Sequence, residues 1–321
     1  METTGSTTSS SRYYIATLIA VLGWGLSTSF VQFGLNYVEP FLFLALRFSV
    51  SALIVTPYIL FTRKHEVIKL FKSPWIYAIG LCETTGLLFQ YEGQMQEYNV
   101  SAGLASLLTM MFIMIVPALS YYLLHEKFTI NHAIAIVLGF IGVFFIVTEG
   151  NLSNLASSST IGVILLLLSA TSYAFYQIIT SKFTREVNKQ VDSIALFYVV
   201  MVSISVYSIG VTLIHSSFSI SLNFPIAAWL WILGLAIFST IIAFTAYFEA
   251  SKGLQANTLS ILLILQMLVP FFVDIAILGK HYSLWVYLGG IIIVLGMVFI
   301  AKIPTENEVL HFQSELPIHQ D

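Results

Sequence analysis

The sequence predicts an all-α fold, a polytopic membrane protein with ten transmembrane helices in two inverted five-helix repeats. Composition, the number of long apolar segments and the placement of basic residues support this prediction. Of the 321 residues, 58% are hydrophobic and only 9% are charged, whereas a soluble domain has about 25% charged residues. So much apolar surface requires lipid or neighbouring helices as its solvent.

Ten apolar segments are long enough to cross a bilayer as helices, which need roughly 20 residues each. Barrel strands are excluded, because they need only about 10 residues and alternate apolar with polar positions. The first segment begins at Tyr13 without a preceding basic stretch or a following cleavage site, so it predicts a retained helix. The segments are 13–35, 40–62, 74–94, 99–124, 131–148, 160–180, 192–214, 226–250, 256–278 and 282–301.

The basic residues predict the orientation, because Lys and Arg in short loops stay on the cytoplasmic side. With ten segments, the even-numbered loops and both termini share one side of the membrane. That side holds 11 of the 13 Lys and Arg residues; the other side has only Lys280, and Arg47 lies within the second segment. We therefore expect an integral membrane protein, in the cell membrane, with both termini cytoplasmic.

The two halves of the chain resemble each other at a shift of 154 residues, which indicates a duplication. Five helices per copy place the second copy upside down, and inverted repeats are typical of transporters that work by alternating access. The expected organisation is a disordered segment over 1–12, repeats over 13–150 and 151–301, and a disordered tail over 302–321. The matching pairs are Trp75 and Trp229, Gly80 and Gly234, Ala102 and Ala256, Ser106 and Ser260, and Gly142 and Gly296.

Motifs at matching places in both copies resemble the EamA repeat of the drug/metabolite transporter superfamily. In the second copy, Lys280 stands where the resemblance leads us to expect an acidic residue, as Glu126 is in the first. The resemblance covers residues 13–301 and implies a carrier, with substrates that range from amino acids to nucleotide sugars and drugs. The motifs are Gly23-Trp24-Gly25, Leu44 to Phe48, Ser101-Ala102, Pro117, Leu124 to Lys127, Gly139 and Gly142, with Pro270 and Gly296 in the second copy.

Glu83 lies near the middle of the third segment, where an ionisable group costs on the order of 2.5–3.5 kcal/mol. Gly86, Gln90 and Gln94 follow on the same helical face. Such a polar stripe predicts a hydrated solute path, with Glu83 as a solute-binding or proton-coupling carboxyl group. The alternative is a carboxyl group that hydrogen-bonds neighbouring helices together.

Arg47 is the only basic residue inside a predicted segment, and its guanidinium could hold a solute carboxylate or phosphate in bidentate geometry. It could equally bind carbonyl groups or an acid of a neighbouring helix. Asp274 and Gln266 in the ninth segment are further candidates, although both could equally pair with other helices, and Lys280 is interpreted as a corner or capping residue. Aromatic and amide side chains on the first and sixth segments suit an amphipathic solute, although aromatic residues at helical spacing also serve packing. These candidates are Trp24, Thr28, Tyr173, Tyr176 and Gln177.

No catalytic signature is present: His125, Glu126 and His132 do not have the HExxH spacing, and GxSxG and P-loop motifs are absent. We expect neither an enzyme nor a catalytic residue, metal or cofactor, and no nucleic-acid partner. The expected partners are a small-molecule solute and the lipid bilayer, with the protein a monomer or a homodimer. The expected function is secondary transport of a small polar or amphipathic metabolite, such as an amino acid. The alternatives are a sugar or nucleotide-linked solute, or a structural or receptor protein of the membrane.

Overall fold

The computed structural model describes residues 6–125, 127–186, 192–216, 221–251, 254, 259 and 262–301, and this part of the chain contains helices and no strands. The predicted tail over 302–321 lies outside the described residues. The α-helices are α1 (Ser6–Gly34), α2 (Pro40–Thr62), α3 (Lys64–Phe71), α4 (Pro74–Gly93), α5 (Ala102–Thr109), α6 (Phe112–Leu124), α7 (Ile130–Thr148), α8 (Ser158–Glu186), α9 (Ser193–His215), α10 (Ile226–Gly234), α11 (Ala243–Ser251), α13 (Leu268–Phe272) and α14 (Leu284–Ala301). The remaining elements are the 3₁₀ segments η1 (Gln96–Tyr98), η2 (Leu152–Ala156) and η4 (Leu265–Met267), and the π-helical segments η3 (Leu235–Ile242) and η5 (Val273–Ile277).

Seven helices in the described chain are long and apolar enough to cross a membrane, and two further apolar helices are shorter. α4 has 20 residues but carries Glu83 and Glu92, and it is not among the seven. The seven are Ser11–Gly34, Pro40–Thr62, Ala102–Leu124, Ile130–Thr148, Ser159–Phe183, Ser193–His215 and Ile226–Ala250, and the shorter two are Leu262–Ile277 and Leu284–Phe299.

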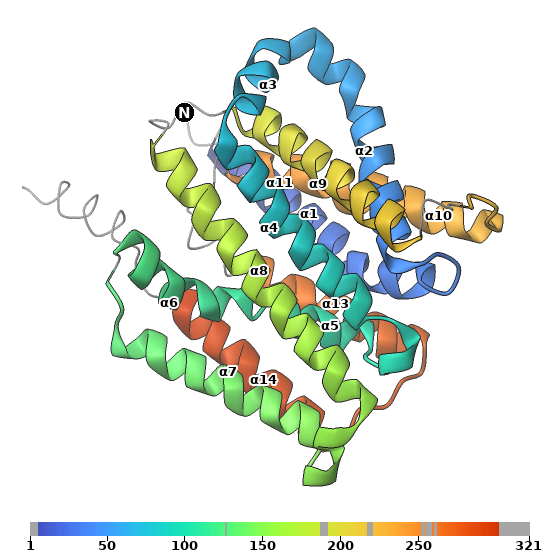
Figure 1. Ribbon diagram of the computed structural model, residues 1–321. Helices are drawn as coiled ribbons and strands as arrows, with labels where there is room; N and C mark the ends of the chain where they lie inside the picture. Colours follow the sequence, from blue (N-terminus) through green and yellow to red (C-terminus); the bar gives the residue numbers. More distant parts are fainter. Residues whose placement is uncertain are drawn as a thin grey trace, which may run out of the picture.

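The chain turns alternately at two ends of the bundle (Figure 1). One end, called the η2 end here, holds the turns after α1, α4, α7, α9 and η5. The opposite end, called the α3 end, holds the turns after α2 and α6. α1 begins at Ser6, so residues 6–12, expected to belong to a disordered segment, extend the first helix instead. Arg12 of this extension forms an ion pair with Glu249 of α11 at 2.5 Å.

Two segments predicted as uninterrupted helices are broken upstream of their prolines. The segment predicted over 99–124 divides into α5 and α6, with 3₁₀-type hydrogen bonds around Met110 and Met111. The segment predicted over 256–278 passes from 3₁₀ to α to π geometry between Leu265 and Ile277. Pro270 has no N–H for the carbonyl group of Gln266, which lies beside α1 at Gly25. A Cβ atom on Gly25 would stand 2.6 Å from that oxygen, so only glycine permits this approach.

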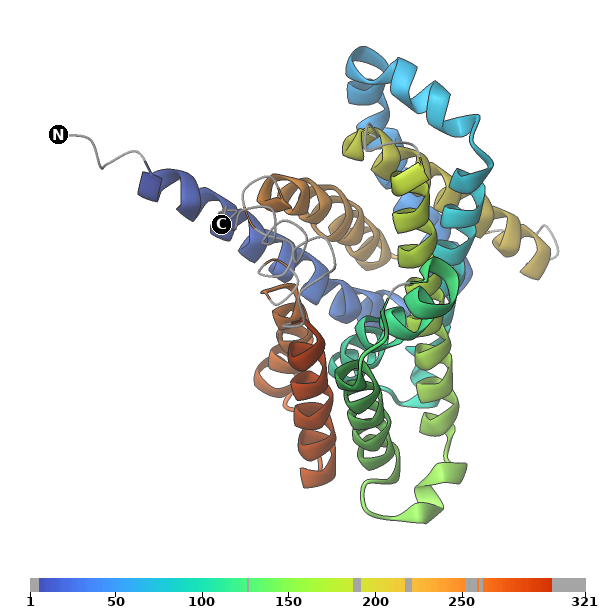
Figure 2. The same cartoon turned by 90° about the vertical axis from the view of Figure 1, so that its left-hand side faces the viewer.

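The helices pack as pairs that form two facing walls around a polar interior. α1 packs against α11, and α4 packs against α8 and α9. α4 and α8 make little direct backbone contact with α11 in the described chain. Figure 2 shows α1 and α11 on one side and α4 and α8 on the other. The two walls therefore face each other across side chains rather than across close helix contacts.

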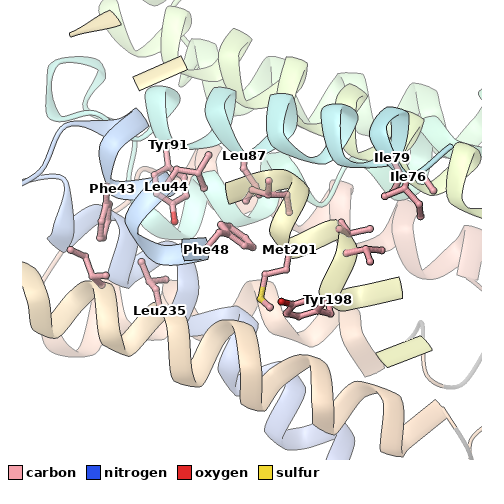
Figure 3. Close-up of a cluster of buried hydrophobic side chains, with 14 of the residues drawn as sticks. Phe43, Leu44, Phe48, Ile76, Ile79, Leu87, Tyr91, Tyr198, Met201 and Leu235 are labelled. Carbon is pink, nitrogen blue, oxygen red and sulfur yellow. The ribbon is translucent and has the colours of Figure 1, made fainter. Parts of the chain in front are cut away.

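An apolar core joins α2, α4, α9 and η3 next to this interior (Figure 3). Phe43 and Leu44 of α2, Tyr91 of α4 and Leu235 of η3 are completely buried, and Phe43 packs against the Tyr91 ring at 5.6 Å. Burying a large apolar side chain contributes about 1.5–3 kcal/mol in water, and in lipid the corresponding gain comes from close packing. This core fixes α2 against α4 and so fixes the place of Arg47 and Tyr91.

Candidate functional site

Arg47 is buried in α2 and donates hydrogen bonds to three hydroxyl groups from three other elements. Nε donates to Oγ1 of Thr240 in η3 at 3.1 Å. Nη1 donates to Oγ of Ser27 in α1 at 3.3 Å and to the hydroxyl group of Tyr91 in α4 at 3.0 Å. Nη2 donates to no described residue, and it is not among the enclosed unpaired atoms. The guanidinium therefore joins the two walls, and one of its amino groups has no hydrogen-bond partner in the described chain.

A hydrogen-bonded chain runs from α8 through α4 to α1. The Tyr173 hydroxyl group donates to Oε1 of Gln90 at 2.6 Å, and Nε2 of Gln90 donates to Oε1 of Gln94 at 3.4 Å. Nε2 of Gln94 then donates to the carbonyl oxygen of Thr28 at 2.9 Å. Gly86 makes this chain possible, because a Cβ atom there would stand 2.7 Å from the Tyr173 ring. Two predicted site residues, Gln90 and Tyr173, are thus in direct contact.

Glu83 lies on the same face of α4, two turns before Gln90. Its side chain is partly exposed, yet Oε2 is enclosed and has no hydrogen-bond partner in the described chain. Glu83 is close enough to interact electrostatically with Arg47, Tyr173 and Tyr176. An enclosed carboxylate oxygen without a partner is costly, so Glu83 is the least satisfied charged group of this interior.

Aromatic side chains of α1 and α11 form the facing wall. The Trp24 ring lies 5.0 Å from Phe244 and 5.4 Å from Tyr247, centroid to centroid. Phe244 stacks on Phe197 of α9 at 4.4 Å. Tyr247 also interacts electrostatically with Tyr176, which connects this wall to α8. These aromatic residues are partly exposed.

Two of the predicted site residues, Thr28 and Gln177, contribute less to this interior than the others. The Thr28 hydroxyl group donates to the carbonyl oxygen of Gly25 within its own helix at 3.3 Å, so Thr28 takes part through its backbone. Gln177 is exposed and lies one turn beyond Tyr173 on α8. The lipid-facing side of α8 carries Leu168 and Phe175, which lie about a third of a turn or more away from this face.

Asp274 forms a second polar cluster at the η2 end. Oδ2 accepts hydrogen bonds from the backbone N–H of Gly103 at 2.8 Å and from the Tyr282 hydroxyl group at 2.6 Å. Oδ1 has no aligned hydrogen bond but forms an ion pair with Nζ of Lys280 at 3.0 Å. The Ser101 and Tyr282 hydroxyl groups are 2.6 Å apart, and Lys280 also donates to Oε1 of Gln32 at 3.3 Å. We call the side chains of Ser101, Asp274, Lys280 and Tyr282 the Asp274 cluster.

Several residues that complete the site could not be found from sequence. Thr240 comes into reach of Arg47 through η3, where its hydroxyl group donates to the carbonyl oxygen of Leu235, five residues earlier, at 3.0 Å. Tyr91 points toward Arg47 although its neighbour Gln90 points toward Tyr173. Tyr247 belongs to the predicted eighth segment, and its only sequence signal is one more aromatic residue in an aromatic-rich chain.

Two pockets of the structure lie away from these residues. An apolar pocket of about 280 Å³ is lined by Phe30, Trp231 and Phe238, and a second of about 390 Å³ lies between the α1–α2 turn and Met95 to Glu97. Neither contains a predicted site residue. We place the candidate site at the polar interior, because its charged and aromatic groups converge there from five helices.

An all-helical bundle with apolar helices of membrane-spanning length and buried charged groups defines an integral membrane protein of the transporter class. The profile of the EamA-like transporter family matches the chain twice, over residues 11–148 and 160–302. The chain belongs to this family.

The chain is also similar to curated proteins along almost its whole length. An "Uncharacterized transporter" of Archaeoglobus fulgidus is 22% identical over 291 residues, which cover 90% of this chain and 98% of that protein. The "Uncharacterized transporter YyaM" of Bacillus subtilis is 22% identical over 304 residues, covering 90% and 95%. A solved structure, described only as "Crystal structure of protein", shares the fold, with a TM-score of 0.60 and 17% identity over 95% of this chain and 99% of that one.

Proposed function

We propose that the protein is a secondary transporter that moves a small polar or amphipathic metabolite, such as an amino acid, across the cell membrane by alternating access. The observation that carries this proposal is the unpaired Oε2 of Glu83, which interacts electrostatically with Arg47, whose Nη2 has no hydrogen-bond partner in the described chain. A carboxyl group that served only in assembly would have both oxygens paired with neighbouring helices, as the Arg47 nitrogens Nε and Nη1 are.

The proposed arrangement has ten spans in two inverted five-helix repeats. Support comes from the two matches to one family profile and from the sequence correspondence at 154 residues. In this proposal, α4 and the two shorter apolar helices also cross the membrane, in addition to the seven long helices. The basic residues favour a cytoplasmic α3 end and an outer η2 end, with both termini cytoplasmic.

The proposed solute has a charged headgroup and an apolar part. The open Nη2 group of Arg47 is suited to a carboxylate, and the unpaired oxygen of Glu83 is suited to an ammonium group or a proton. Trp24, Phe244 and Tyr247 offer ring faces to the apolar part. A zwitterion that engages both charges would lose less on leaving water than a singly charged solute, because each of its charges finds a partner.

Counterflow in proteoliposomes, with a screen of radiolabelled amino acids and other metabolites, tests the proposal. The wild type should exchange at least one zwitterionic solute, and transport should depend on pH. Glu83→Gln keeps the size and hydrogen-bonding shape of the side chain but cannot ionise, so this variant should lose the pH dependence.

The matched control is Glu92→Gln, because Glu92 lies at the end of the same helix and forms no part of the proposed path. It should retain the pH dependence of the wild type. If folded Glu83→Gln transports with an unaltered pH profile, Glu83 does not couple protons.

A further inference from the structure

We propose that the Asp274 cluster, together with Gln94, is the outer gate of the transporter, and that this gate is closed in the structure. The inference rests on the proposed alternating-access transport. It adds which residues must separate before the solute path opens to the outside.

The Asp274 cluster joins the α4–α5 hairpin to the corner before α14. Because the Tyr282 hydroxyl group has one proton and gives it to Asp274, Ser101 must donate to the Tyr282 oxygen. Asp274 also accepts the backbone N–H of Gly103 near the start of α5, and the side chain of Asp274 is fully buried. A carboxylate in this position is held by groups from both repeats at once.

Two glutamines join the same hairpin to α1. Oε1 of Gln32 accepts the N–H of Ala102 at 3.1 Å, and its Nε2 donates to the carbonyl oxygen of Val100 at 3.3 Å. Nε2 of Gln94, on the other side of the hairpin, donates to the carbonyl oxygen of Thr28. The tip of the hairpin is thus bound to α1 and to the corner before α14, and it cannot move outward while these bonds persist.

The charged contacts recorded at the α3 end have a different arrangement. Arg12 pairs with Glu249 between α1 and α11, which belong to the same wall. Arg63 pairs with Asp192 at 2.8 Å where α2 packs against α9, and Lys182 lies 5.5 Å from the Trp75 ring between α8 and α4. Each of these contacts joins two elements, whereas the bonds around Asp274, Lys280 and Gln32 together join η5, the start of α5, the corner before α14 and α1.

Burial along the proposed path follows the same direction. Gln94 is 1% exposed and Gln90 8%, both close to the η2 end. Further along, Glu83 and Tyr176 are partly exposed, and Gln177 is exposed. Of these side chains, those nearest the η2 end are the most buried, as expected of a path that is closed on the outer side.

The gate has no counterpart of the same chemistry in the first repeat. At the shift of 154 residues, Asp274, Lys280 and Tyr282 correspond to Ser120, Glu126 and Phe128. The Asp274–Lys280 ion pair therefore has no equivalent at the corresponding positions of the first repeat. Removing it should shift the equilibrium toward the outward-open state without weakening a matching contact of that repeat.

Thiol accessibility tests the gate without any solute, on the full chain in sealed vesicles of both orientations. The background is Cys82→Ser, since Cys82 is the only cysteine. Thr28→Cys reports from behind the proposed gate, and Gln177→Cys reports from the inner part of the path. Tyr282→Phe removes only the hydroxyl group and leaves the ring packed at 5.3 Å from Phe271.

In Tyr282→Phe and in Lys280→Gln, labelling at position 28 by an impermeant outside reagent should accelerate about two- to tenfold, the effect of one hydrogen bond on a two-state equilibrium. Labelling at position 177 from inside should slow in the same variants. Tyr287→Phe is the matched control, because this exposed tyrosine packs beside Tyr282 and its hydroxyl group has no recorded hydrogen bond.

Unaltered labelling in both gate variants, with the protein folded, would overturn the gate, as would acceleration at both reporters, which indicates general loosening. If the gate variants label as expected while no solute is exchanged in counterflow, the gate stands and the proposed transport fails. If solute is exchanged in counterflow while labelling is unaltered in the gate variants, the proposed transport stands and the gate fails.

Discussion

At the scale of single residues, Arg47 combines two roles that substitution can separate. Its Nε and Nη1 bond Thr240, Ser27 and Tyr91, which supports the fold, and its open Nη2 is proposed to bind the solute. Arg47→Ala removes both, so the melting temperature in detergent and the affinity for solute should fall together. The loss of stability should be about 0.5–1.5 kcal/mol for each hydrogen bond.

Tyr91→Phe is the matched variant for Arg47, because it deletes one acceptor and leaves the guanidinium in place. Its melting temperature should fall, while its solute affinity, measured by titration on the same preparation, stays close to that of the wild type. Tight solute binding by Arg47→Ala would show that Arg47 is a purely structural residue.

Gly86 supports the contact between α4 and α8, and we expect Gly86→Ala to destabilise the protein. The added methyl group would meet the Tyr173 ring, so the ring must shift and the 2.6 Å hydrogen bond to Gln90 must lengthen. Overpacking of this kind costs about 1–3 kcal/mol. Melting curves in detergent should record this loss.

The control for Gly86 is Gly210→Ala in α9, where a Cβ atom would meet nothing within 4 Å. Alanine favours helix over glycine by up to about 1 kcal/mol, so this variant should be unchanged or slightly more stable. Equal melting temperatures of the two variants would mean that the α4–α8 contact accommodates the added methyl group without loss of stability.

Part of the site is predictable from the sequence at this scale. The sequence identifies Glu83, Arg47 and Gln90 as candidates, because a charged or amide side chain is costly in an apolar segment. The partners of Arg47 are not visible, because Thr240 lies 193 positions away in the chain. Which of several hydroxyl groups meets the guanidinium depends on helix packing, and periodicity contains no information about it.

At the scale of elements, helix length is predictable and helix regularity is not. The apolar segments follow from composition, and the long helices agree with them to within a few residues. The sequence does not predict the division into α5 and α6 or the π-helical geometry of η3. At η3 another helix comes close, because a Cβ atom on Gly23 of α1 would stand 2.9 Å from the carbonyl oxygen of Phe238. A proline indicates that an irregularity is near, but the break at Met110 and Met111 precedes Pro117 by six residues.

At the scale of the whole molecule, the distribution of basic residues predicts the topology, which is open to a direct test. In the Cys82→Ser background, Leu152→Cys at the 68% exposed tip of η2 should react with an impermeant thiol reagent from outside the cell. His65→Cys in α3, also exposed, should react only after the cells are opened. The reverse pattern would invert the proposed orientation.

The ion pair between Lys280 and Asp274 also bears on how this protein is inserted during biosynthesis. Lys280 is the only basic residue that the proposed topology places in an outer loop, and a lysine is costly to carry across the hydrocarbon layer. Asp274 lies six residues earlier in the same hairpin, 3.0 Å from the ammonium group once the corner has formed. If the hairpin folds as it translocates, the two charges cross as a neutral unit, and a closing contact of the finished carrier first assists its assembly in the membrane.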